Sequence, residues 1–382
     1  MTRRSRLTKP LGALGVALAS AMLTATVAQA APTTDAAVQT ALQQLVRSNG
    51  GPPGAIATLY RDGQLTILRA GRANVKTPGA PMATEHMRIA SISKAFSAAV
   101  ALHLVQEGRL SLDDRIGQML PAFPRSWASV TVRELLNHTS GVPDYTRSKA
   151  FAKQAASDPR GYVSPAEIIG WVRKDRLAFR PGSRYEYSNT DNIIVGLIAQ
   201  SVTHTPYPAL VKRIVLRPAD LTQTTFPTRR IGLPAPFIHG YIVSRGKAPT
   251  DVTTFLSPSG AWASGAIVST PTDLGAFIRA DLGLKFFGAA QQQQQMRFVR
   301  GSSSPAGPGA NAAGLGLFRY TTRCGSVYGH TGNFPGYTQF AAATADGSRS
   351  VTTTLNIPAP TGKLLKKLRA AQAEAVCALL GR

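Results

Sequence analysis

Two residues three positions apart have the right types for serine acyl transfer. Ser91 and Lys94 form an SxxK sequence, and residues three apart share one face of a helix, so the hydroxyl and the amine can meet. A serine hydroxyl becomes an effective nucleophile when a base takes its proton, and lysine is such a base when burial or nearby cations lower its pKa. A second SxxK sequence, Ser244 to Lys247, contains a glycine. We expect Ser91 to be the nucleophile and the second sequence to be a solvated loop.

The residues after Ser91 predict the helix that holds this pair. From Ser93 to Glu107, apolar residues recur at helical spacing, and Gly108 ends the pattern. Free N–H groups at a helix start stabilise negative charge. If Ser91 lies there, its own N–H forms half of an oxyanion hole.

Two more motifs follow along the chain. Tyr187 and Asn189 form the one YxN sequence among its tyrosines, on a predicted loop. His330 to Gly332, an HTG sequence, follows a strand pattern at Ser326 to Tyr328, and its glycine would let a substrate approach a strand edge. A similar sequence at 138–141 lies in a loop without such a strand.

In the order SxxK, YxN and HTG, the three motifs resemble the penicillin-recognising serine enzymes, the superfamily of serine β-lactamases and D-alanyl-D-alanine carboxypeptidases. The resemblance includes the segments LLNHTSG at 135–141 and SGAWASGAIVSTPTDL at 259–274. The third motif of this superfamily is usually KTG, and its replacement by HTG is similar to the secreted D-alanyl-D-alanine carboxypeptidases, which are class C-like. Class A β-lactamases fit poorly, because their second motif is SDN and no segment with their deacylating glutamate is visible.

The resemblance implies catalytic roles for Ser91, Lys94 and Tyr187 and a substrate contact for Asn333. Ser91 would attack the carbonyl of a penultimate D-alanine, with Lys94 and Tyr187 relaying its proton. Tyr187 would then protonate the departing D-alanine. Backbone N–H groups of Ser91 and Asn333 would hold the oxyanion.

The same resemblance implies further substrate contacts. Asn189 would bond the acyl amide, and His330 with Thr331 would face the terminal carboxylate. Trp262 would form an apolar wall beside the acyl chain or belong to the ordinary core. Arg319 would pair with the terminal carboxylate or lie on the surface.

The first thirty residues have the pattern of a secretory signal peptide. Four basic residues precede an apolar run from Leu11 to Val27, and small residues follow at 28–30. An uncleaved membrane anchor is the alternative, and the Arg3–Arg4 pair leaves the twin-arginine route open. We expect cleavage near Ala30 and a protein that is secreted or held at the cell envelope.

The charge and the cysteines restrict the partners and the compartment. The chain has a net charge of +24, but its basic residues are scattered and no nucleic-acid-binding motif accompanies them. We therefore expect peripheral association with an anionic cell envelope and no nucleic acid.

The histidines and cysteines have no metal-ligand spacing, so no metal and no cofactor are expected. Cys324 and Cys377 predict one disulfide in an oxidising compartment, with two buried thiols as the alternative; the pair also resembles a disulfide of the secreted carboxypeptidases.

Strand patterns occur at both ends of the chain and helical patterns between them. The predicted elements include a hairpin (54–60 and 65–70), an apolar helix (193–202), two late strands (337–343 and 349–356) and a closing helix (362–380). This order indicates an α/β fold of the α+β type, with a mainly antiparallel sheet from the N- and C-terminal segments, flanking helices and an inserted helical subdomain. We expect a catalytic domain over 31–382, with a sheet subdomain of about 31–95 and 261–382 and a helical subdomain of about 96–260.

Together these observations predict a secreted, monomeric serine D-alanyl-D-alanine carboxypeptidase. Its substrate would be a peptidoglycan stem peptide, and β-lactam antibiotics would acylate Ser91. A class C-type β-lactamase, a carboxylic-ester hydrolase and a D-amino-acid peptidase remain alternatives on the same scaffold. An alternative of another class is a penicillin- or peptide-binding module without turnover.

Overall fold

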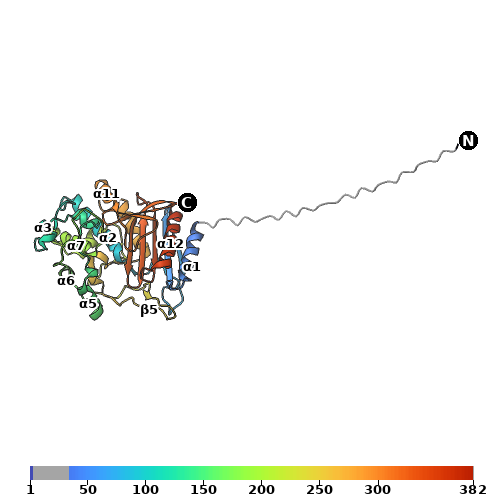
Figure 1. Ribbon diagram of the computed structural model, residues 1–382, viewed down its shortest axis with the longest axis horizontal. Helices are drawn as coiled ribbons and strands as arrows, with labels where there is room; N and C mark the ends of the chain where they lie inside the picture. Colours follow the sequence, from blue (N-terminus) through green and yellow to red (C-terminus); the bar gives the residue numbers. More distant parts are fainter. Residues whose placement is uncertain (3–33, 382) are drawn as a thin grey trace. The chain divides into compact units, whose positions relative to one another are not determined.

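One eight-stranded antiparallel sheet lies at the centre of the computed structural model, which describes residues 1–2 and 34–381 (Figure 1). The strand order is β2-β1-β12-β11-β10-β9-β8-β7, so both ends of the described chain contribute. The strands are β1 (Gly54–Arg61), β2 (Gln64–Gly71), β7 (Val299–Arg300), β8 (Ala310–Ala313), β9 (Phe318–Thr322), β10 (Gly325–Phe334), β11 (Tyr337–Ala343) and β12 (Ser350–Leu355). Two short pairs join β3 (Met87–Arg88) with β6 (Val268–Ser269) and β4 (Tyr241–Ile242) with β5 (Thr250–Asp251).

Most of the helices lie between the strands of the two ends. The α-helices are α1 (Thr34–Val46), α2 (Ser93–Gln106), α3 (Ile116–Met119), α4 (Val132–Leu136), α5 (Lys149–Ser157), α6 (Pro165–Gly170), α7 (Asn189–Thr203), α8 (Tyr207–Val211), α9 (Trp262–Gly265), α10 (Pro271–Leu282), α11 (Ala289–Gln295) and α12 (Gly362–Leu380). The short 3₁₀ or π segments are η1 (Ala90–Ile92), η2 (Arg125–Trp127), η3 (Tyr145–Arg147), η4 (Lys212–Leu216) and η5 (Pro258–Gly260). The predicted fold class is confirmed, and the division into two subdomains stays a prediction.

Two helices from opposite ends of the chain cover one face of the sheet. Figure 1 shows α1 and α12 together on the side of the sheet away from α2 and α7. Their apolar side chains, including Leu42 and Val376, pack on sheet residues such as Val327 and Phe340. The opposite face of the sheet packs on α10 and the remaining helices, which form the larger core. The central strands are thus buried on both faces, and η1 contacts β10 and β11.

Strand β10 is longer than the sequence pattern indicated. The predicted strand was Ser326 to Tyr328, whereas β10 continues to Phe334 and pairs with β11 along the whole HTG motif. The motif therefore lies inside a central strand, in which residues 329–332 are all buried. Its side chains point alternately to the two faces of the sheet.

A disulfide joins Cys324, in the turn between β9 and β10, to Cys377 in α12. The two Cα atoms are 5.2 Å apart, within the usual range for a disulfide. The bond links the outer helix layer to the strand that carries the third motif. The predicted signal peptide lies outside the described residues, except for Met1 and Thr2.

Removing this disulfide should weaken the fold. The bond closes a loop with a sequence separation of 53, for which the loop-entropy relation gives about 4 kcal/mol. The double variant Cys324→Ser/Cys377→Ser should lose about this much free energy of unfolding in denaturant titrations. The wild-type protein measured under strong reductant should show the same loss, and an unchanged midpoint in both would contradict the prediction.

Candidate active site

Ser91 lies at the turn that leads into helix α2. It is the middle residue of η1, and α2 begins two residues later at Ser93. The preceding residue, Ala90, has a φ of 50°, a left-handed conformation that costs a non-glycine residue about 1–2 kcal/mol. The surrounding packing holds this turn, because Ala90 and Ile92 are buried. The turn leaves Ser91 partly exposed at the edge of two cavities.

Lys94 is fully buried and points at Ser91. Its Nζ donates to Ser91 Oγ at 3.0 Å, to Asn189 Oδ1 at 2.9 Å and to the Ser264 carbonyl oxygen at 2.7 Å. Burial lowers the pKa of Lys94 to about 7, although the negative charges of Asp144 and Asp191 oppose this shift. A large share of Lys94 is therefore unprotonated near neutral pH. In that form its Nζ can accept the proton of Ser91.

Tyr187 forms a second wall of the site. The Lys94 Nζ lies 5.1 Å from the centroid of its ring. Its hydroxyl is buried and makes no hydrogen bond of normal geometry, although Ser91 is near enough to act on its pKa. Burial raises the pKa of the Tyr187 phenol well above its usual value, and the interaction with Ser91 opposes this rise. The phenol is thus protonated at neutral pH and able to donate.

Asn189 connects the lysine to a carboxylate. It is the first residue of α7, its Oδ1 accepts from Lys94, and its Nδ2 donates to Asp144 Oδ2 at 3.0 Å. Asp144 also accepts from the backbone N–H of Thr146 at 3.0 Å. Both ends of the Asn189 amide are therefore occupied before any substrate binds. The Asn189 Oδ1 has a second lone pair, so an acyl amide N–H can bond it beside Lys94.

His330 and Thr331 differ from their expected roles at a terminal carboxylate. His330 is fully buried, and burial, followed by the charge of Lys94, lowers its pKa to about 3, so its ring is neutral at neutral pH. The Thr331 Oγ1 donates to the Pro305 carbonyl oxygen at 2.6 Å. Neither residue lines the cavities that contain Ser91. The structure therefore gives no cation at this motif to hold a carboxylate.

Gly332 brings the third motif close to the nucleophile. A Cβ at this position would overlap the Ile89 carbonyl oxygen and would lie 3.2 Å from the Ala90 Cβ. The glycine thus allows β10 to pack against the turn of Ser91. Sequence reasoning had expected the same glycine to admit a substrate to the strand edge.

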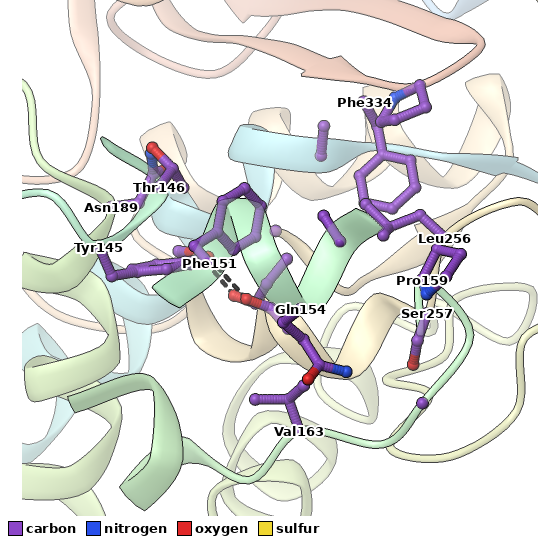
Figure 2. A pocket seen from close by; sticks show the side chains of 18 of the residues that line it. Tyr145, Thr146, Phe151, Gln154, Pro159, Val163, Asn189, Leu256, Ser257 and Phe334 are labelled. Atoms are coloured by element: carbon purple, nitrogen blue, oxygen red, sulfur yellow. Dashed lines mark hydrogen bonds between the residues drawn. The ribbon is translucent and has the colours of Figure 1, made fainter. Parts of the chain in front are cut away.

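Two cavities meet at Ser91. One, of about 180 Å³, is largely apolar, and the other, of about 270 Å³, is polar; Asn189 and Asn333 also line both. Figure 2 shows Tyr145 and Phe151 on one side of the apolar cavity, with Phe334 and Leu256 on the other. The polar cavity is also lined by Asp144, Thr146, Arg147, Tyr187 and Ser304. The arrangement separates an apolar subsite from a charged one.

The structure places two of the expected substrate contacts elsewhere. Trp262 is 6% exposed, packs against the ring of Tyr207 at 5.1 Å and does not line either cavity at Ser91. It belongs to the core alternative, since α9 directs it between α7 and α8. Arg319 is exposed on β9 and lies over the ring of Phe298 at 4.9 Å, which corresponds to its surface alternative.

Sequence reasoning missed several residues of the site. Asp144 and the Ser264 carbonyl contact the Asn189–Lys94 pair, and His138 packs on Tyr187. The position of residues 138–141 in the LLNHTSG segment is a signal that points to His138. No three His, Cys, Asp or Glu side chains within residues 34–381 gather as a metal site would require. In the same range, no helix combines the length and apolarity needed to cross a bilayer.

The fold and this Ser–Lys–Tyr cluster are typical of a serine hydrolase that forms an acyl-enzyme. Residues 35–375 match the sequence profile of the Beta-lactamase family, and the chain belongs to that family. The resemblance to the superfamily of serine β-lactamases and D-alanyl-D-alanine carboxypeptidases is thereby confirmed, as is the assignment as an enzyme.

Relatives and solved structures support the same family. "Protein flp" of Staphylococcus aureus strain N315 is 30% identical over 182 residues, which cover 46% of this chain and 35% of that protein. Penicillin-binding protein 4* of Bacillus subtilis strain 168 is 26% identical over 67% of this chain and 58% of its own length. The chain thus spans only part of these curated relatives.

Two solved structures match nearly their full length. A D-stereospecific amidohydrolase from Streptomyces sp. is 30% identical, with a TM-score of 0.77 over 88% of this chain and 98% of that one. A D-amino acid amidase from Ochrobactrum anthropi SV3 is 25% identical, with a TM-score of 0.78 over 91% of this chain and 98% of its own.

Proposed function

We propose that the protein is a secreted D-stereospecific serine amidohydrolase, which cleaves the amide bond on the carbonyl side of a D-residue. The choice of an amidohydrolase rests on the charge of the site. Among the described residues that line the two cavities at Ser91, the one Lys or Arg is Arg147, and its Nη1 is paired with Glu186 at 3.1 Å. A substrate whose acyl-donor part is not followed by a terminal carboxylate suits a site with this charge. The near full-length similarity to two D-specific amidohydrolases supports the same substrate class.

The proposed reaction begins with acylation of Ser91. Unprotonated Lys94 takes the Ser91 proton across their 3.0 Å contact while Oγ attacks the carbonyl carbon. The amide C–N bond then breaks, and the Tyr187 hydroxyl gives its proton to the leaving nitrogen. Lys94 returns its proton to the phenolate. Water, deprotonated by Lys94, then attacks the ester carbonyl carbon, the bond from that carbon to Oγ breaks, and Lys94 returns the proton to the Ser91 Oγ.

The two cavities divide the substrate between them. The apolar cavity, with Phe151, Trp171 and Phe334 in its lining, accepts the D-residue side chain. The polar cavity, with Asp144 and Arg147, accepts the polar groups next to the scissile bond. Backbone N–H groups of Ser91 and Asn333 are the proposed oxyanion donors, because Asn333 lines both cavities with Ser91.

D-alanyl-D-alanine carboxypeptidase activity is the second candidate. The HTG sequence favours it, and Arg147 could hold a terminal carboxylate if it exchanged its contact with Glu186 for the substrate. The Arg147 side chain is 68% exposed, so this exchange requires little rearrangement. Penicillins, as analogues of such peptides, would acylate Ser91 under either proposal.

A matched substrate set separates the candidates. The mature protein would be incubated with D-phenylalanine amide, L-phenylalanine amide, a peptide ending in D-Ala-D-Ala, and benzylpenicillin. Faster hydrolysis of the D-amide than of the L-amide and the peptide supports the amidohydrolase. Release of D-alanine as the dominant reaction selects the carboxypeptidase, and rapid turnover of penicillin alone would select a β-lactamase and overturn both.

We further propose that the protein acts outside the cytoplasm at the cell envelope. The basic, apolar and small-residue pattern of residues 3–30 and the net charge of +24 support this location. Fractionation of cells that express the whole chain should find the shortened protein in the medium or in a salt-extractable envelope fraction. A full-length protein confined to the cytoplasm would contradict it.

A further inference from the structure

The His138 ring packs against the Tyr187 ring. His138 belongs to a hydrogen-bonded network that has no part in the proposed reaction. The centroids of the two rings are 4.4 Å apart, with an interplanar angle of 41°. His138 is 2% exposed and has a φ of 60°, which is unfavourable for a residue with a Cβ. Such a conformation persists when its surroundings hold it.

A buried carboxylate holds the His138 ring. The Nδ1 of His138 lies 2.8 Å from Asp191 Oδ2, and the Ser140 hydroxyl donates to Asp191 Oδ1 at 2.6 Å. Asp191 is fully buried in the first turn of α7, two residues after Asn189. Burial lowers the pKa of His138 and raises that of Asp191. The hydrogen bond between His138 Nδ1 and Asp191 Oδ2 fixes the plane of the ring.

Backbone hydrogen bonds join the same loop to the segment that leads to Tyr187. The His138 carbonyl oxygen accepts from the N–H of Glu186 at 2.9 Å, and the Thr139 carbonyl oxygen accepts from Gly182 at 2.8 Å. The Tyr187 hydroxyl, by contrast, has no hydrogen bond of normal geometry. The position of the phenol therefore depends on contacts to the faces and edge of its ring.

We propose that His138, held by Asp191 and Ser140, is a positioning residue that keeps the Tyr187 phenol aligned for proton transfer to the leaving group. This inference rests on the proposed function. The step it serves is the breaking of the C–N bond, in which the Tyr187 O–H proton moves to the leaving nitrogen and Lys94 restores it. The Asp191 network also ties Tyr187 to α7, the helix that presents Asn189 to Lys94.

The test compares two leaving groups on one acyl group. A p-nitroanilide of D-phenylalanine needs a proton on its leaving nitrogen, whereas the p-nitrophenyl ester leaves as a stable anion. His138→Ala should lower kcat/KM for the anilide by about 100-fold and for the ester by less than about 10-fold. Asp191→Asn, which conserves the shape, should show the same selectivity to a smaller degree. Equal losses on both substrates would assign His138 a purely structural role and overturn the proposal.

Two further variants sharpen the result. Tyr187→Phe should reproduce the anilide-selective loss, and the double variant Tyr187→Phe/His138→Ala should lose little more, because both changes remove one function. His239→Ala is the matched control, since it breaks another histidine–aspartate contact, His239 Nδ1 to Asp251 Oδ2 at 2.6 Å, outside the cavities at Ser91. Fully additive losses in the double variant would contradict the proposal.

Failure of the proposed function can be distinguished from failure of the positioning role of His138. If the wild-type protein cleaves no D-anilide, the amidohydrolase proposal fails, and the same comparison is made with benzylpenicillin and a fluorophosphonate. Opening of the penicillin requires a proton on its ring nitrogen, whereas fluoride leaves without one. Slower penicillin acylation with unchanged fluorophosphonate labelling in His138→Ala supports the positioning role, and parallel changes overturn it.

Discussion

Ser91→Ala should abolish acyl transfer and leave the protein folded. The side chain of Ser91 accepts from Lys94 Nζ at 3.0 Å and lies near the Tyr187 hydroxyl, so its removal deletes the attacking atom without breaking the core. Loss of a catalytic nucleophile lowers kcat by about 10⁴-fold or more. The rate of D-amide hydrolysis and the mass of the penicillin adduct are the two measurements.

The chain contains its own control for this experiment. Ser244 has the same SxxK spacing to Lys247, but both lie in an exposed turn after β4. Ser244→Ala should retain full activity and adduct formation. Residual turnover in Ser91→Ala at more than about a tenth of the wild-type rate would contradict the assignment of the nucleophile.

Lys94→Met should strongly lower kcat/KM and should abolish its dependence on pH near pH 7. Burial lowers the pKa of Lys94 from 10.5 to about 7, and the base is the unprotonated amine. In the wild-type protein, kcat/KM should rise about tenfold per pH unit below pH 7 and level off above it. The variant should be slower by about 10³-fold near pH 8, with no inflection near pH 7. Methionine fits the buried site, since it replaces a chain of similar length.

The pH profile distinguishes catalysis from packing. Lys247→Met, in the exposed turn, should keep the wild-type profile. If Lys94→Met keeps the inflection near pH 7 with a lower plateau, another group titrates in the reaction. A flat wild-type profile between pH 5 and pH 8 would exclude Lys94 as the base.

The sequence predicted the elements with strong periodic patterns closely. The helix after Ser91 was expected over 93–107 and is α2 at 93–106, and the hairpin at 54–70 became β1 and β2 with nearly the same bounds. Local spacing suffices there to place the ends of each element, although α2 and β1 are buried on nearly all sides. Lys94 and Ser91 meet for the same reason, as neighbours one turn apart.

Contacts between segments that are distant in the chain were harder to predict from the sequence. Asp144 and Asp191 had no local signal, because their effect on Lys94 depends on how α7 packs beside η3. The HTG motif was recognised, but the buried, neutral state of His330 follows from the length of β10 and from the sheet around it. Trp262 was ambiguous because α9 has only four residues, too few for a periodic pattern.

The pairing of β1 with β12 also governs when the chain can become active during its synthesis. Ala55 pairs with Leu355, so the ribosome must add about 300 residues between the two halves of one ladder. A nascent chain that already contains Ser91, Lys94 and Tyr187 still lacks β10, the strand that packs against the nucleophile turn. The catalytic centre therefore cannot be completed before β10 has been translated.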